Sequence, residues 1–209
     1  DISGRVRTGK VMLYNPENGR RIKKPHNYIT WVHSLLKKEN FNLRQCLFGE
    51  HLLSSDQQRP VALVESEKSA LISSFYLPQY LWIASGGKNG AFNRDAMSVL
   101  RNRRVLLFPD LGATDYWNSK MEMIRSLGIE VSLFDFMERN ATKEERDAGY
   151  DIADFLLREE TKDAIFNRLI TLNPALKTLV ETFDLQLVNV EKAPLSATVQ
   201  HTRKGLFKR

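Results

Sequence analysis

The sequence has little cysteine and no long apolar run, and these two absences exclude several classes of protein. Cys46 is the single cysteine among 209 residues, so neither a disulfide framework nor a zinc ribbon can form within the chain. No apolar stretch approaches the length that spans a bilayer, and no signal-peptide pattern opens the sequence. We therefore expect a globular protein without a membrane partner, in a reducing, cytoplasmic setting.

Positive charge exceeds negative charge by 6 and is distributed unevenly. Basic residues dominate up to Glu50 and again in the tail, whereas acidic residues collect between Glu65 and Glu160. A basic flank around an acidic centre suits a metal-dependent enzyme that acts on nucleic acid, although a run of charge is also typical of a plain solvated face. The side chains expected to contact nucleic acid are Arg5, Arg7, Lys10, Lys23, Lys24 and Lys88.

The segment from Pro60 to Ile72 organises the rest of the chain. Its four apolar residues at 61–64 predict a buried strand, which Glu65 follows at once, and Ser66 then suits the N-cap of a helix. Residues 104–110 repeat this order, with a strand that leads to Asp110. Because parallel strands present their carboxyl ends at one edge, we expect Glu65 and Asp110 to share a crevice that suits Mg²⁺. The alternative is that each carboxylate merely caps the helix that follows it.

Strands and helices alternate in the central part of the sequence. We expect strands at 61–65, 80–84, 104–109 and 129–134, and helices at 66–76, 93–101 and 114–127. This alternation predicts an α/β fold with a mostly parallel, Rossmann-like sheet flanked by helices. Upstream we expect a β-hairpin over 5–24 with its turn at 15–19, then a helix over 30–38. Downstream we expect a charged loop at 138–146 and helical segments over 151–182, broken near 173–174.

Two of these segments carry a resemblance to a known family. Residues 64–70 (Val-Glu-Ser-Glu-Lys-Ser-Ala) and 105–113 (Val-Leu-Leu-Phe-Pro-Asp-Leu-Gly-Ala) resemble the Toprim domain of bacterial primases, topoisomerases and some nucleases. The resemblance spans about residues 60–157 and implies that Glu65 acts as general acid or base while Asp110 binds Mg²⁺ or Mn²⁺. The second aspartate of the family's Asp-x-Asp pair falls on Gly112 here. Asp115 is either a substitute ligand or an N-cap, and we favour the cap.

Further segments resemble bacterial primases in particular. Residues 149–156 (Gly-Tyr-Asp-Ile-Ala-Asp-Phe-Leu) resemble the acidic segment after the last Toprim strand, which implies that Asp151 and Asp154 join Glu65 and Asp110 at the metal. The alternative is that both aspartates only stabilise the amino end of a helix. Residues 4–7 and 48–50 resemble the hairpin and the Leu-Phe-Gly segment of the primase core. The chain is also similar to Toprim proteins from mobile elements of gut bacteria.

These resemblances set the expected organisation and function. Residues 1–58 would form a small basic α+β subdomain, 59–158 the Toprim domain, and 159–209 a helical extension with a basic tail. The expected activity is primase-like nucleotidyl transfer from NTPs on single-stranded DNA or RNA/DNA, with replication proteins of a mobile element as possible partners. A Toprim nuclease remains an alternative. A module that binds nucleic acid without catalysis is another alternative, because Gly112 stands in the place of the second aspartate of the family's Asp-x-Asp pair.

The loop at 85–90 (Ser-Gly-Gly-Lys-Asn-Gly) has two open interpretations. Its backbone N–H groups, with Lys88, would suit a phosphate group. Alternatively, the glycines serve only a tight turn.

Overall fold

The computed structural model describes residues 1–17, 19–87, 90–158 and 162–186. The chain divides into two compact units, Asp1–Glu159 and Glu160–Arg209. Residues 1–58 fall within the first unit, together with the sheet. Within the described part of the chain, no helix combines the length and apolar character that crossing a bilayer requires.

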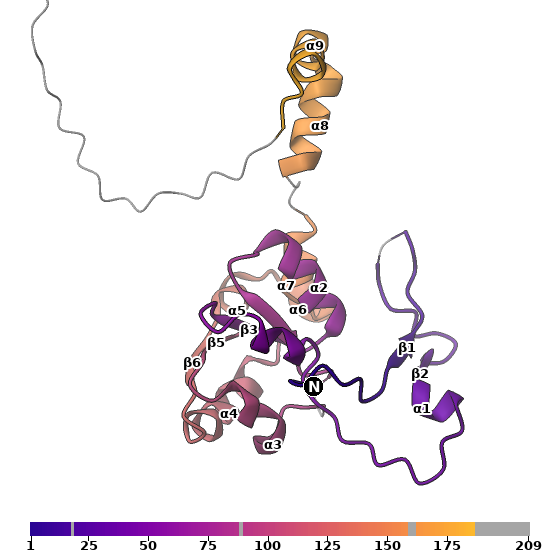
Figure 1. Ribbon diagram of the computed structural model, residues 1–209, viewed down its shortest axis with the longest axis vertical. Coiled ribbons are helices and arrows are strands. Elements are labelled where there is room, and N and C mark those ends of the chain that lie inside the picture. The colour runs from indigo at the N-terminus through magenta and orange to yellow at the C-terminus, as the bar shows by residue number, and fades with distance from the viewer. Residues whose placement is uncertain (18, 88–89, 159–161, 187–209) are drawn as a thin grey trace, which may run out of the picture. The chain divides into compact units, whose positions relative to one another are not determined.

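A four-stranded parallel sheet forms the centre of the first unit (Figure 1). Its strands are β3 (Val61–Val64), β4 (Leu81–Ala84), β5 (Arg104–Leu107) and β6 (Glu130–Leu133), in the order β4-β3-β5-β6. β3 and β4 are buried along their whole length, as expected of strands covered on both faces. The expected strand positions are confirmed to within a few residues at their ends. The arrangement is consistent with a Rossmann-like fold.

Helices cover both faces of this sheet. On one side are α3 (Arg94–Met97), the 3-10 helix η2 (Ser98–Leu100) and α4 (Thr114–Arg125). On the other side are α2 (Glu67–Tyr76), α5 (Phe136–Asn140) and α7 (Ile152–Leu156), and α2 packs directly against α7 (Figure 1). A further 3-10 helix, η1 (Glu50–Ser54), precedes the sheet.

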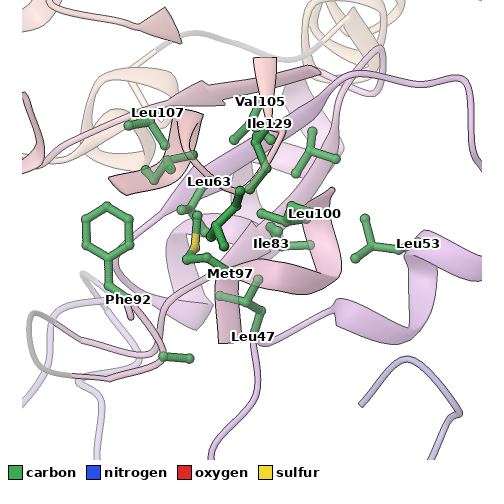
Figure 2. Close-up of a cluster of buried hydrophobic side chains, with 14 of the residues drawn as sticks. Leu47, Leu53, Leu63, Ile83, Phe92, Met97, Leu100, Val105, Leu107 and Ile129 are labelled. Atoms are coloured by element: carbon green, nitrogen blue, oxygen red, sulfur yellow. The ribbon is translucent and has the colours of Figure 1, made fainter. Parts of the chain in front are cut away.

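The two faces of the sheet build two separate cores. Along β3, Val61 and Leu63 enter the first cluster, whereas Ala62 and Val64 enter the second. This follows from the two-residue period of side chains along a strand. In the first cluster, side chains from the strands and from the segment of α3 and η2 converge around Leu63 and Met97 (Figure 2). The second cluster is rich in aromatic contacts, such as Trp82 with Phe108 at 4.9 Å between ring centroids.

The expected pairing near the amino terminus is wrong in part. The strand β1 (Lys10–Met12) pairs antiparallel with β2 (Ile29–Trp31), and not with residues 20–24. The expected turn does close, because Tyr14 and Arg21 form an isolated antiparallel bridge. Since β2 takes residues 29–31, the helix expected over 30–38 shortens to α1 (Val32–Leu35). Long-range strand pairing thus overrides the local helical pattern.

The charged segment expected as a loop is helical. It contains the end of α5 and most of α6 (Lys143–Ala148), which begins with a capping box formed by Thr142 and Glu145. The reciprocal hydrogen bonds of such a box stabilise a short, highly charged helix that has no buried side chain of its own.

The second unit contains two helices, α8 (Lys162–Leu172) and α9 (Pro174–Phe183). The break expected near 173–174 is confirmed. Asn173 accepts hydrogen bonds from the N–H groups of Ala175 and Leu176, and Pro174 occupies the first turn of α9, where a missing N–H costs nothing. None of this unit's described side chains is buried.

We predict that Leu63→Ala destabilises the protein far more than Leu71→Ala. Leu63 is fully buried in the first cluster, whereas Leu71, on α2, is 62% exposed. The buried substitution should lower the free energy of unfolding by about 2–5 kcal/mol because it removes packed atoms and leaves a cavity. The exposed substitution should change it by less than about 0.5 kcal/mol. Urea unfolding followed by circular dichroism measures both, and equal losses would contradict this assignment of the core.

Candidate functional site

Glu65 and Asp110 leave the sheet at the same edge, from neighbouring strands. Glu65 follows β3 directly, and Asp110 lies just beyond β5. These two strands are parallel, with Leu63 opposite Leu107. The helix after β3 packs into the second cluster and the helix after β5 into the first, so the chain crosses to opposite faces here. Such a switch point opens a crevice at the carboxyl ends of the strands.

An open groove with a volume of about 800 Å³ lies at this edge. Side chains of both signs of charge line it. The acidic ones are Glu65, Glu67, Asp110, Asp151 and Asp154. The basic ones are Lys10, Arg20, Arg21, Lys23, Lys24 and Lys68. The four carboxylates expected to hold a metal therefore line one groove, although residues 65 and 154 are far apart in the sequence.

The carboxyl group of Asp110 has a strongly raised pKa. Burial, together with the neighbouring charges of Asp151, Glu65 and Asp154, raises its pKa to about 8. Lys68 acts in the opposite direction but does not cancel it. Negative charge is therefore under-compensated around Asp110, and a cation bound there would stabilise the ionised carboxylate.

Asp151 and Asp154 cap α7, as the alternative interpretation had it. Asp151 Oδ1 accepts the N–H of Asp154, and Asp154 Oδ2 accepts the N–H of Asp151, each at 3.1 Å. Asp151 Oδ2 also accepts a hydrogen bond of 2.5 Å from the hydroxyl of Ser69, which is completely buried on α2. The two aspartates cap the helix and also lie near Asp110, since both line the groove. Ser69 was not among the residues expected at the site.

The chemistry of these donors fits a hard cation such as Mg²⁺. Among the described residues, no group of three or more His, Cys, Asp or Glu side chains is arranged as a ligand set. Mg²⁺ is, however, commonly held by one or two carboxylates and several waters. Glu65 and Asp110 supply oxygen donors only, and the buried carboxyl of Asp110 lacks a balancing positive charge.

Lys10 is engaged with the protein itself. Its Nζ forms an ion pair of 2.7 Å with Glu67 Oε1 and donates to the carbonyl of Gly86, also at 2.7 Å. The same ammonium lies 5.6 Å from the ring centroid of Trp31. Lys10 therefore ties the amino-terminal strands to α2 and to the loop after β4.

The other basic residues singled out from the sequence separate into three groups. Lys23 and Lys24 are exposed and line the groove. Arg5 and Arg7 lie in a different hollow and pair with Asp1, with Arg7 Nη2 at 2.7 Å from its carboxylate. Lys88 lies outside the described residues. Lys68 also lines the groove.

The glycines of the loop after β4 serve a turn. The N–H groups of Gly86 and Gly87 both donate to the carbonyl of Glu65, at 2.9 and 3.0 Å, so they are not directed at a ligand. Their φ angles of +79° and +121° are accessible to glycine at little cost. The phosphate interpretation of these two amides is therefore wrong, and the loop instead fixes the backbone of Glu65.

Asp115 is not the N-cap of α4. Ala113 occupies that position, and Asp115 lies in the first turn of the helix, where a carboxylate interacts favourably with the helix dipole. It is not among the residues that line the groove.

Comparison with known proteins places the chain in a family. Residues 1–111 match the family described as "Domain of unknown function (DUF6371)". The chain belongs to the DUF6371 family. No curated protein matches it. Among solved structures, the DUF6371 chain is similar to the crystal structure of the Aquifex aeolicus primase, zinc-binding and RNA polymerase domains, with 14% sequence identity and a TM-score of 0.41. The match covers 73% of this chain and 43% of that one, so the chain spans less than half of the solved fragment.

We predict that Asp110→Asn stabilises this DUF6371 protein at pH 7 in the presence of EDTA. An unfolded aspartate ionises near pH 4, whereas folded Asp110 keeps its proton until its pKa of about 8. Between these values the unfolded chain binds fewer protons, so the stability of the wild type falls as the pH rises from 4 to 8. Asparagine does not ionise, and the gain at pH 7 should be about 4 kcal/mol, with almost none at pH 4.

Chemical denaturation at pH 4, 6, 7 and 8 measures this gain. Asp147→Asn, at an exposed position on α6, is the control and should change the stability by less than about 0.5 kcal/mol at each pH. If Asp110→Asn were less stable than the wild type at pH 7, the claim that negative charge around Asp110 lacks a balancing positive charge would be wrong.

Proposed function

We propose that this chain carries a Toprim-type catalytic site and performs primase-like nucleotidyl transfer on single-stranded DNA, with Mg²⁺ or Mn²⁺. The observation that carries the proposal is the meeting of Glu65 and Asp110 at the switch point of the sheet, in a groove that also holds basic side chains. Carboxylates suit a divalent cation, and lysine and arginine suit the phosphates of a template and of NTPs. The sequence motifs around these two residues support the same assignment.

Each group in the groove has a role in this proposal. Glu65, whose backbone is fixed by the loop after β4, moves the proton of the attacking hydroxyl. Asp110, with Asp151 or Asp154, holds the cation. When bound, the metal would position the substrate and offset charge that develops on the phosphoryl group. Lys23 and Lys24 contact the backbone of the template strand from the rim of the groove.

We predict that Glu65→Gln reduces primer synthesis at least about 100-fold, the usual contribution of a positioned general acid or base. The assay supplies NTPs, single-stranded DNA and Mg²⁺ or Mn²⁺, and EDTA should abolish synthesis. Glu122→Gln, at an exposed position on α4, is the matched control and should retain wild-type synthesis.

The other outcomes of this assay separate the alternatives. Synthesis that is unaffected by Glu65→Gln would refute the role of Glu65. DNA cleavage without NTPs would replace the proposal with a Toprim nuclease. If the wild type neither synthesises nor cleaves, and isothermal titration calorimetry detects no metal binding, salt-sensitive DNA binding would identify a non-catalytic module.

We predict that the double variant Lys23→Ala/Lys24→Ala binds single-stranded DNA more weakly than the wild type. Its affinity should also depend less on salt concentration. Loss of two phosphate contacts should reduce the magnitude of the slope of log K against log [salt] by about 1.4, at about 0.7 per contact. Arg101→Ala/Arg125→Ala is the charge-matched control, because Arg101 precedes β5 and Arg125 ends α4, at the opposite edge of the sheet. Fluorescence anisotropy at several salt concentrations measures both slopes, and equal effects of the two double variants would place the DNA elsewhere.

A further inference from the structure

The turn that carries Asp110 is held by groups from outside its own strand and helix. The carbonyl of Asp110 accepts the N–H of Ala113 at 2.9 Å, which closes a four-residue turn. Gly112, third in the turn, has a φ of +81°, as the third residue of a type II turn requires. The N–H of Leu111 donates to the carbonyl of Tyr150 at 2.9 Å. The remaining N–H of the turn's centre, that of Gly112, donates to Glu138 Oε2 at 2.8 Å.

Glu138 is tightly engaged on both of its oxygens. Oε2 also accepts the hydroxyl of Thr114 at 3.1 Å, so one oxygen binds both sides of Ala113. Oε1 pairs with the guanidinium of Arg146, which also donates to the carbonyl of Glu138. The hydrogen bond from Gly112 is the main cause of a lowered pKa at Glu138, with smaller contributions from Thr114 and Arg146.

These contacts cross between separate elements of the fold. Glu138 lies on α5, Arg146 on α6 and Thr114 at the start of α4. A hydrogen bond to a charged acceptor is stronger than one between neutral groups. The contacts of Glu138 therefore tie the 110–113 turn to α5, α6 and the start of α4.

We propose that Glu138 is a positioning residue for Asp110: by binding Gly112 and Thr114 together, it holds the 110–113 turn so that the Asp110 carboxylate stays in the groove. The proposal rests on the proposed function only where it concerns metal binding. A residue that merely satisfied one backbone amide would affect Gly112 alone. A positioning residue affects the whole turn, including the Ala113 N–H that bonds to Asp110.

Amide hydrogen exchange of the full chain, followed by NMR in EDTA, tests the positioning role without any metal. In Glu138→Ala, the amides of Gly112 and of Ala113 should both exchange at least about 10-fold faster than in the wild type. Glu138→Gln keeps an oxygen for Gly112 and should restore most of the protection. Glu144→Ala, an exposed acidic position on α6, should leave both rates unchanged.

Faster exchange at Gly112 with an unchanged rate at Ala113 would overturn the proposal, because Glu138 would then satisfy a single amide. If Glu138→Ala does not fold, Arg146→Ala decides the matter. It frees Glu138 from α6 and should speed exchange at both amides, and unchanged rates would overturn the proposal.

Calorimetry with Mn²⁺ then connects the turn to the proposed site. If the wild type binds Mn²⁺, Glu138→Ala should weaken binding about 10-fold or more, as loss of an outer-shell partner does, and Glu138→Gln should recover most of the affinity. Equal affinity in wild type and Glu138→Ala would refute positioning of a metal ligand. If the wild type binds no Mn²⁺, the proposed function fails, while the exchange rates still decide the role of Glu138.

Discussion

The parallel pairing of β3 with β5 is the constraint on which the rest of the first unit depends. Because the chain crosses to opposite faces of the sheet after these two strands, a crevice opens between the helices where both strands end. That edge is where Glu65 and Asp110 emerge. The two buried clusters and the groove thus have one origin, since the same crossovers that fill both faces leave this edge open.

Gathering carboxylates at one edge carries a cost that the surrounding structure has to offset. Burial and acidic neighbours raise the pKa of Asp110 to about 8. Ionisation of its carboxyl group therefore lowers the stability of the folded protein. Several contacts hold the cluster in place nonetheless. Ser69 binds Asp151 from α2, the loop after β4 fixes Glu65, and Glu138 holds the turn beside Asp110. Local destabilisation of this kind is typical of functional sites, and stabilising substitutions are often found there.

The sequence predicted the sheet well because the signal for it is local. An uninterrupted apolar run such as 61–64 has few alternatives to a buried strand, and the carboxylate after it must emerge at an edge. The amino-terminal region was harder. Residues 29–31 pair with β1 across a long loop, and no local pattern shows that partner. The contacts of Ser69 and Glu138 were not predictable either, since each depends on the packing of elements far apart in the sequence.

The acidic residues of α7 show why capping and ligand binding need not exclude each other. A capping carboxylate accepts one N–H through one oxygen and keeps lone pairs on both. Asp154 uses Oδ2 for the N–H of Asp151, so its remaining lone pairs are available to water or a cation. Asp151 already accepts bonds on both oxygens, including the short one from Ser69. Of these two aspartates, Asp154 therefore has more lone pairs left to accept hydrogen bonds from water near Asp110. Asp151 contributes chiefly through its negative charge.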